Sequence, residues 1–196
     1  MHIIGGTDVG SVRTVNEDYY KIFKFSDTCF CAVVADGMGG HKGGKVASTV
    51  AATYIVDFIR ENIHNAENTD DSMYDILKKA VNGANELVYK KSLEDNELSG
   101  MGTTAVAVIY NSGTVYIANV GDSRLYVISD GIKQITKDHS LVQDLIDQGL
   151  LSPDKANEHP NKNIITRAVG TEKDVEIDFY KLEVDSDFKL LMCTDG

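Results

Sequence analysis

The feature that most constrains this chain is an apolar run of strand length that stops at a carboxylate. Residues 31–35 are Cys-Ala-Val-Val-Ala, Asp36 follows, and five of the next eight residues are glycine. A strand buried on both faces can present an ionisable group only at its end, where it leaves the core. The glycines allow backbone atoms to approach a ligand or ion closely. The pattern predicts that Asp36 is a metal ligand.

Two further apolar strands are predicted to end in the same way. The run 114–120 leads to Asp122 and the run 188–194 leads to Asp195, each aspartate beside a glycine. Asp-Gly by itself is first of all a turn signal. Because three such pairs stand at the ends of the most apolar strands, we expect Asp36, Asp122 and Asp195 to converge on one edge of a sheet structure.

Composition limits the class of partner. The 196 residues are 42% hydrophobic and 25% charged, which is typical of a globular chain with one sizeable core. The formal net charge of −11 argues against nucleic acid or an anionic membrane surface as a partner, because both would repel the chain. The same charge suits divalent cations.

Neither an export signal nor a membrane span is recognisable in the sequence. No basic and apolar leader follows Met1, and no apolar run approaches the ~20 residues that cross a bilayer. The three cysteines are odd in number and are expected to be reduced core residues. We therefore expect a cytoplasmic protein, and a monomer.

Hydrophobic periodicity predicts the order of the elements. Apolar stripes at 46–59 and 73–88 predict two antiparallel helices. Segment 138–170 combines a short helical pattern with polar stretches and is predicted to be a lid-like insertion, or flap. Strands are predicted through Ile3 and Ile4 and over residues 19–25, 28–35, 105–110, 114–120, 124–128, 132–136, 175–183 and 188–194.

Motifs spread along the whole chain resemble the bacterial metal-dependent Ser/Thr protein phosphatases of the protein phosphatase 2C type. They occur in the order of that family, at residues 7–18, 35–41, 99–104, 119–124, 138–140, 165–170 and 193–196. The resemblance implies an α+β fold, in which two antiparallel sheets form a β-sandwich flanked by antiparallel helix pairs in four layers (αββα). It also implies a single phosphatase domain over residues 1–196, with the flap at about 138–170.

The resemblance further implies a two-metal centre at one end of the sandwich. Asp36 would bridge both ions, the Gly37 carbonyl would bind one of them, and Asp195 would bind the other. Oxygen ligands of this kind suit Mn²⁺ or Mg²⁺. Two such ions ~3.5–4 Å apart activate a bridging hydroxide for direct attack on a phosphomonoester.

Further residues receive supporting roles from the same resemblance. Glu17 and Asp18 would hold metal-bound waters, although on their own they read as an ordinary charged loop. Asp122 would contribute to a third, weaker metal position. Arg13 would grip the phosphate with its forked guanidinium, although an isolated arginine is usually solvated.

The group that protonates the leaving oxygen is left open by the sequence. His41 is one candidate and a metal-bound water is another. His159, in the flap, could instead touch substrate. His139 is expected to be a structural hydrogen-bonding residue, and Arg124 to brace a turn.

The function expected from these features is removal of phosphate from phosphoserine and phosphothreonine in proteins, opposing a bacterial Ser/Thr kinase. Two alternatives are a non-catalytic module that binds a phosphoprotein, and a hydrolase of small phosphate esters or nucleotides. Members of the family continue past the position of Gly196 to a further metal-binding aspartate. The chain is accordingly expected to be truncated at its C-terminus.

Overall fold

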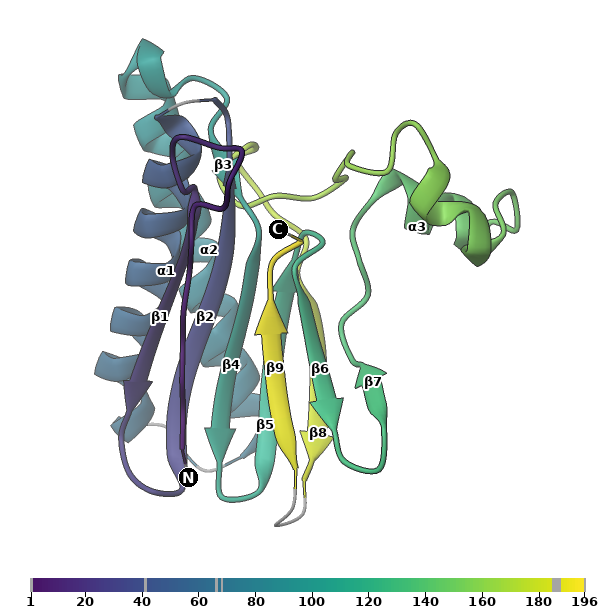
Figure 1. Ribbon diagram of the computed structural model, residues 1–196. Coiled ribbons are helices and arrows are strands. Elements are labelled where there is room, and N and C mark those ends of the chain that lie inside the picture. Colours follow the sequence, from purple (N-terminus) through teal and green to yellow (C-terminus); the bar gives the residue numbers. More distant parts are fainter. Residues whose placement is uncertain (1, 41, 66, 68, 185–187, 196) are drawn as a thin grey trace.

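The computed structural model describes residues 2–40, 42–65, 67, 69–184 and 188–195. Two antiparallel sheets pack face to face, and two long helices cover the outer side of one of them (Figure 1). The first sheet has the order β1-β2-β4-β5-β8, with β3 paired to β2; its strands are β1 (Asp18–Lys24), β2 (Cys29–Met38), β3 (Gly102–Thr103), β4 (Ala105–Asn111), β5 (Thr114–Val120) and β8 (Asp178–Glu183). The second sheet has the order β7-β6-β9 and consists of β7 (Ile132–Gln134), β6 (Arg124–Ile128) and β9 (Lys189–Cys193).

Alternating side chains give the first sheet an apolar surface on both faces. In β2, Val33 and Ala35 pack toward the helices, whereas Phe30 and Ala32 pack toward the second sheet. Strands β4 and β5 are buried almost throughout, which explains why they read as continuous apolar runs. The core therefore lies on either side of the first sheet.

The helices α1 (Gly43–Asn62) and α2 (Asp70–Glu94) form where the apolar stripes predict them. Alanines in both stripes are fully buried, which lets the helices approach the sheet closely. Thr69 caps α2 by accepting a hydrogen bond from the Ser72 N–H at 3.3 Å. Short 3₁₀ helices follow each long helix, η1 (Ile63–Asn65) and η2 (Asn96–Leu98).

The strand predicted through Ile3 and Ile4 is wrong. Residues 2–17 form no strand in the described structure, and the Ile4 side chain is 92% exposed. The apolar run of Ile3 and Ile4 is followed at once by Gly5 and Gly6. Two residues are too few to form a stable β-strand unless a neighbouring strand pairs with them. Among the described elements, no helix covers the outer face of the second sheet, where Ile132 and Leu191 are exposed.

The segment predicted as a flap projects from the sandwich (Figure 1). It contains α3 (Leu141–Asp147) and η3 (Pro153–Glu158). A β-bridge between Ser140 and Ile165 closes its base, and a second bridge joins Thr103 to Val169. The first bridge thus ties the two arms of the flap to each other, and the second ties the returning arm to β3 of the first sheet. None of the described helices is long and apolar enough to cross a membrane.

Candidate active site

Asp36 lies near the end of β2, where two threonines fix its main chain. The Asp36 N–H donates to Thr104 Oγ1 at 2.8 Å. The Asp36 carbonyl accepts from the Thr104 N–H at 2.9 Å and from Thr103 Oγ1 at 2.8 Å. Both threonines are buried. Because fully paired buried backbone is held in place, the threonines set the direction in which the Asp36 carboxylate leaves the sheet.

Gly37 and Gly44 bring the start of α1 against the end of β2. A Cβ atom on Gly37 would lie 2.0 Å from the Gly44 carbonyl oxygen, and one on Gly44 would lie 2.4 Å from Glu17 Oε1. The Gly37 N–H donates to the Glu17 carbonyl at 3.2 Å. Glycine is therefore required here because two main-chain segments and Glu17 lie close together, whereas the sequence pattern predicted close approach to a ligand or ion.

Asp18 begins β1 and is the cross-strand partner of Asp36. Thr194 Oγ1 donates to Asp18 Oδ2 at 2.9 Å, which joins the end of β9 to the start of β1 across 176 residues. Asp195 follows Thr194 and lies close enough to Asp36 to affect its ionisation. The ends of both sheets thus converge on Asp36.

Asp122 stands in the turn between β5 and β6. Gly121, before it, has a φ of +103°, and a Cβ there would lie 2.6 Å from the Thr104 side chain. Ser123, after it, shares a hydrogen bond of 2.7 Å with Thr104 Oγ1. Thr104 therefore links the Asp122 turn directly to the main chain of Asp36.

The aspartates form one electrostatic cluster. Burial, and after it the neighbouring carboxyls of Asp18 and Asp195, raise the pKa of Asp36 to about 8. Burial also raises the pKa of Asp122, followed by the charge of Asp195. Carboxyls that disfavour one another's ionisation are stabilised by a bound cation.

Glu17 borders this cluster and has an unused buried oxygen. Its Oε1 atom is buried without a hydrogen-bond partner, while Oε2 lies 3.7 Å from Arg13 Nη1. The Arg13 side chain is 67% exposed, so its guanidinium stands at the border between the cluster and solvent. A buried carboxylate oxygen without a hydrogen-bond partner marks a place where a water or a cation would supply the missing partner.

The donor set fits Mn²⁺ or Mg²⁺. It consists of carboxylate and main-chain carbonyl oxygens, and the orphaned Glu17 oxygen adds an acceptor for a bound water. Within the described ranges, no three His, Cys, Asp or Glu side chains are arranged to hold a metal ion by themselves. An ion here would complete its coordination with the Gly37 carbonyl and water, since Mg²⁺ usually retains several waters.

Two other residues named from the sequence make their described side-chain hydrogen bonds outside the aspartate cluster. His159 caps η3, and its described hydrogen bond is local, with Nδ1 accepting from the Asn161 N–H at 3.2 Å. Arg124 braces the turn as expected, by donating to both carboxylate oxygens of Asp138. His41 lies outside the described residues.

Sequence reasoning did not identify Thr103, Thr104 and Ser123 as residues that position the site. Their motif was recognised, but hydroxyl residues at strand ends are common, and only their burial shows that they bind main chain. The sequence signal for their role is the pair of adjacent threonines, Thr103 and Thr104, directly before a fully apolar strand.

The acidic centre at the strand ends of this β-sandwich offers only oxygen donors, the kind that divalent cations such as Mg²⁺ and Mn²⁺ prefer. The family model described as Protein phosphatase 2C matches residues 6–196. The chain belongs to the protein phosphatase 2C family.

Members of this family are similar to the chain in sequence and structure over nearly its whole length. "Serine/threonine phosphatase stp" of Listeria monocytogenes is 40% identical, over 100% of this chain and 77% of the relative. "Protein phosphatase PhpP" of Streptococcus pneumoniae is 35% identical, over 97% of this chain and 76% of the relative. The crystal structure of serine/threonine phosphatase Stp1 from Staphylococcus aureus superposes with a TM-score of 0.85 at 38% identity, over 96% of this chain and 73% of that one. The similarity confirms the predicted α+β fold with two antiparallel sheets and helices.

Proposed function

We propose that the chain hydrolyses phosphoserine and phosphothreonine in proteins and thereby opposes a bacterial Ser/Thr kinase. The observation that carries the proposal is the convergence of Asp18, Asp36, Asp122 and Asp195 from distant parts of the chain. The printed names of the relatives support the choice of substrate class.

Mn²⁺ or Mg²⁺ is the proposed cofactor, with two ions at the centre and a third, weaker position at Asp122. Asp36, Asp195 and the Gly37 carbonyl are the proposed ligands. When bound, the ions supply a water activated for attack on phosphorus and positive charge to balance the phosphate. The raised pKa of Asp36 supports this assignment, because such a carboxyl gains most from a nearby cation.

The chain's own side chains orient the reacting groups. Glu17 and Asp18 offer acceptor oxygens that would hold water in place, and the hydrogen bonds of Thr104 keep Asp36 in one position. Arg13 has a mostly exposed fork of N–H donors beside Glu17, which suits two oxygens of a phosphate.

Several finer assignments stay predictions. His41 and a water molecule are alternative donors of the proton to the leaving oxygen, and His159 is a proposed substrate contact in the flap. One domain over residues 1–196, a monomeric state, a cytoplasmic location and the absence of nucleic-acid and membrane partners likewise stay predictions.

The test is release of phosphate from a phosphothreonine peptide over a range of Mn²⁺ concentrations. Asp36→Asn serves as the inactive control, and p-nitrophenyl phosphate and a nucleotide serve as competing substrate classes. We expect activity that depends on the metal and favours the peptide. Preference for the small esters would contradict the protein substrate. Tight binding of the phosphopeptide without turnover would instead favour a binding module.

A further inference from the structure

His139 holds Gly121 at two points. The Gly121 N–H donates to His139 Nδ1 at 3.1 Å, and the His139 N–H donates to the Gly121 carbonyl at 3.0 Å. His139 is only 5% exposed, so solvent has little access to compete for these bonds. On its other side Gly121 lies against Thr104, with no room even for a Cβ atom. The turn is therefore confined between a histidine and a threonine.

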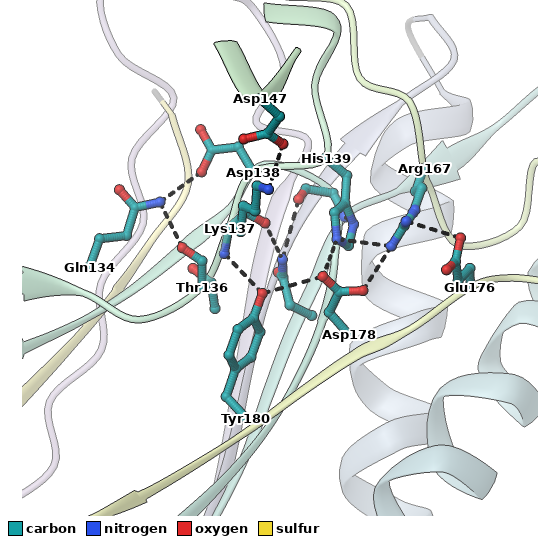
Figure 2. Close-up of polar contacts among 12 residues, drawn as sticks. Gln134, Thr136, Lys137, Asp138, His139, Asp147, Arg167, Glu176, Asp178 and Tyr180 are labelled. Carbon is teal, nitrogen blue, oxygen red and sulfur yellow. Dashed lines mark hydrogen bonds and ion pairs between the residues drawn. The ribbon is translucent and has the colours of Figure 1, made fainter. Parts of the chain in front are cut away.

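Asp178 fixes which nitrogen of the histidine carries the proton. Because Nδ1 accepts from an N–H group, it has no proton, and Nε2 must carry one. Asp178 Oδ2 lies 3.1 Å from His139 Nε2 and accepts this hydrogen bond (Figure 2). Arg167 Nη1 lies 3.2 Å from the same nitrogen and donates to Asp178 Oδ1 at 2.8 Å. Asp178 thus accepts from both neighbours and orients the imidazole ring.

The turn held by His139 carries Asp122 into the aspartate cluster. Asp122 follows Gly121 directly, and Ser123, the next residue, is bound to Thr104. Asp122 is thereby fixed on one flank by the histidine and on the other by the threonine that also binds Asp36. A shift of the His139 ring would move the Asp122 carboxylate relative to Asp36.

The same histidine closes the base of the flap. Its carbonyl accepts from the Thr166 N–H at 2.9 Å, and the neighbouring Ser140 bridges to Ile165. Arg167 comes from the returning arm of the flap and also pairs with Glu176 at 3.0 Å (Figure 2). The two arms of the flap base therefore meet at one buried histidine.

We infer that His139 is a positioning residue for the phosphatase reaction, which sets the Asp122 turn through Gly121 while Asp178 fixes its tautomer and Arg167 joins the flap base to it. The inference rests on the proposed function. It goes beyond a structural hydrogen bond, because it assigns the histidine an effect on metal affinity and turnover.

Two substitutions of similar size separate the two hydrogen bonds of the ring. In His139→Asn the side-chain oxygen takes the place of Nδ1 and can still accept from Gly121, but the bond to Asp178 is lost. In His139→Gln the amide reaches the place of Nε2 and can still bind Asp178, but the acceptor for Gly121 is lost. We expect the asparagine variant to stay within about threefold of the unmodified chain, and the glutamine variant to lose about tenfold or more in kcat and in Mn²⁺ affinity.

The readouts are kcat and KM for a phosphothreonine peptide, Mn²⁺ binding by calorimetry, and the thermal midpoint of unfolding. We expect kcat to fall much more than KM in the glutamine variant, with similar midpoints for both variants. Equal losses in both variants, or unchanged Mn²⁺ affinity in the glutamine variant, would overturn the inference.

Nitrogen NMR of the His139 ring tests the geometry without any activity. We expect an unprotonated Nδ1 and a protonated Nε2, and a proton on Nδ1 overturns the inference whatever the turnover. An unmodified chain that neither binds Mn²⁺ nor releases phosphate would instead refute the proposed function and, with it, the role of His139 in turnover, even if the ring has the expected tautomer.

Discussion

Asp18 lies directly opposite Asp36 in the register of β1 and β2. Like charges at opposite positions of an antiparallel pair destabilise a sheet. Asp195 adds a third carboxyl beside them, and burial strengthens the repulsion. Thr194 offsets part of this by donating to Asp18. The arrangement is unfavourable in the metal-free chain and becomes favourable once a cation is bound.

Asp36→Asn should therefore stabilise the metal-free chain while abolishing its activity. Removing one of the crowded charges is expected to raise the free energy of unfolding by about 1–2 kcal/mol at pH 8 after allowance for solvent screening. Phosphatase activity should fall by at least about 100-fold. Urea unfolding in the presence of a chelator measures the first effect, and phosphate release measures the second.

A matched control is Asp130→Asn, at an exposed position in the loop between β6 and β7. It should change neither stability nor activity. If Asp36→Asn destabilised the metal-free chain, the repulsion argued for this cluster would be refuted.

Gly37→Ala should disrupt the junction between β2 and α1. The added Cβ would meet the Gly44 carbonyl, which is backbone and cannot rotate away. We expect a loss of about 2–4 kcal/mol in the free energy of unfolding, as for other severe overpacking. Gly6→Ala is the control, because nothing lies within 4 Å of its Cβ position. Equal stability of the two variants in urea unfolding would contradict the close approach.

Thr104→Val should show whether one hydroxyl holds Asp36. Valine keeps the shape of the side chain but leaves the buried Asp36 N–H without its acceptor. We expect the free energy of unfolding to fall by about 1–3 kcal/mol. Thr104→Ser keeps the oxygen and should retain most of the activity. The comparison of kcat and urea midpoint for the two variants is the measurement. A valine variant as active as the serine variant would show that the hydroxyl has no positioning role.

Asp178 should contribute stability that disappears in acid. Burial acts to raise the pKa of Asp178, but hydrogen bonds from His139 and Arg167 outweigh it and hold that pKa below its ordinary value. A carboxylate whose pKa is lower in the folded state than in the unfolded state stabilises the fold at pH values above its unfolded-state pKa, near 3.9. This contribution is lost as the pH falls through the folded-state pKa.

The measurement is the difference in unfolding free energy between the unmodified chain and Asp178→Asn, followed from pH 7 down to pH 3 by urea titration. We expect the difference to be largest near neutrality and to shrink below about pH 4. A difference that grew on acidification would have the wrong sign for this pKa and would contradict the contacts described.

Local patterns in the sequence predicted most of the fold. The stripe through Ala47, Ala51 and Ile55 packs on the first sheet as expected, and the apolar runs of β4 and β5 are its buried centre. Periodicity succeeds here because a strand or helix must turn its apolar side inward wherever it lies. The prediction of a strand through Ile3 and Ile4 was wrong because a strand also needs a neighbouring strand to pair with. A local sequence pattern carries no information about that neighbour.

The sequence by itself also determined which residue types could form a site, since a buried strand can expose Asp36, Asp122 or Asp195 only at its end. The tertiary structure decided which groups meet. Asp36 meets Asp18 through strand register, and Gly121 meets His139 because the start of the flap packs against the turn between β5 and β6. Such contacts join segments far apart in the chain. They depend on register and on packing between elements, and hydrophobic periodicity carries information only about burial within each element.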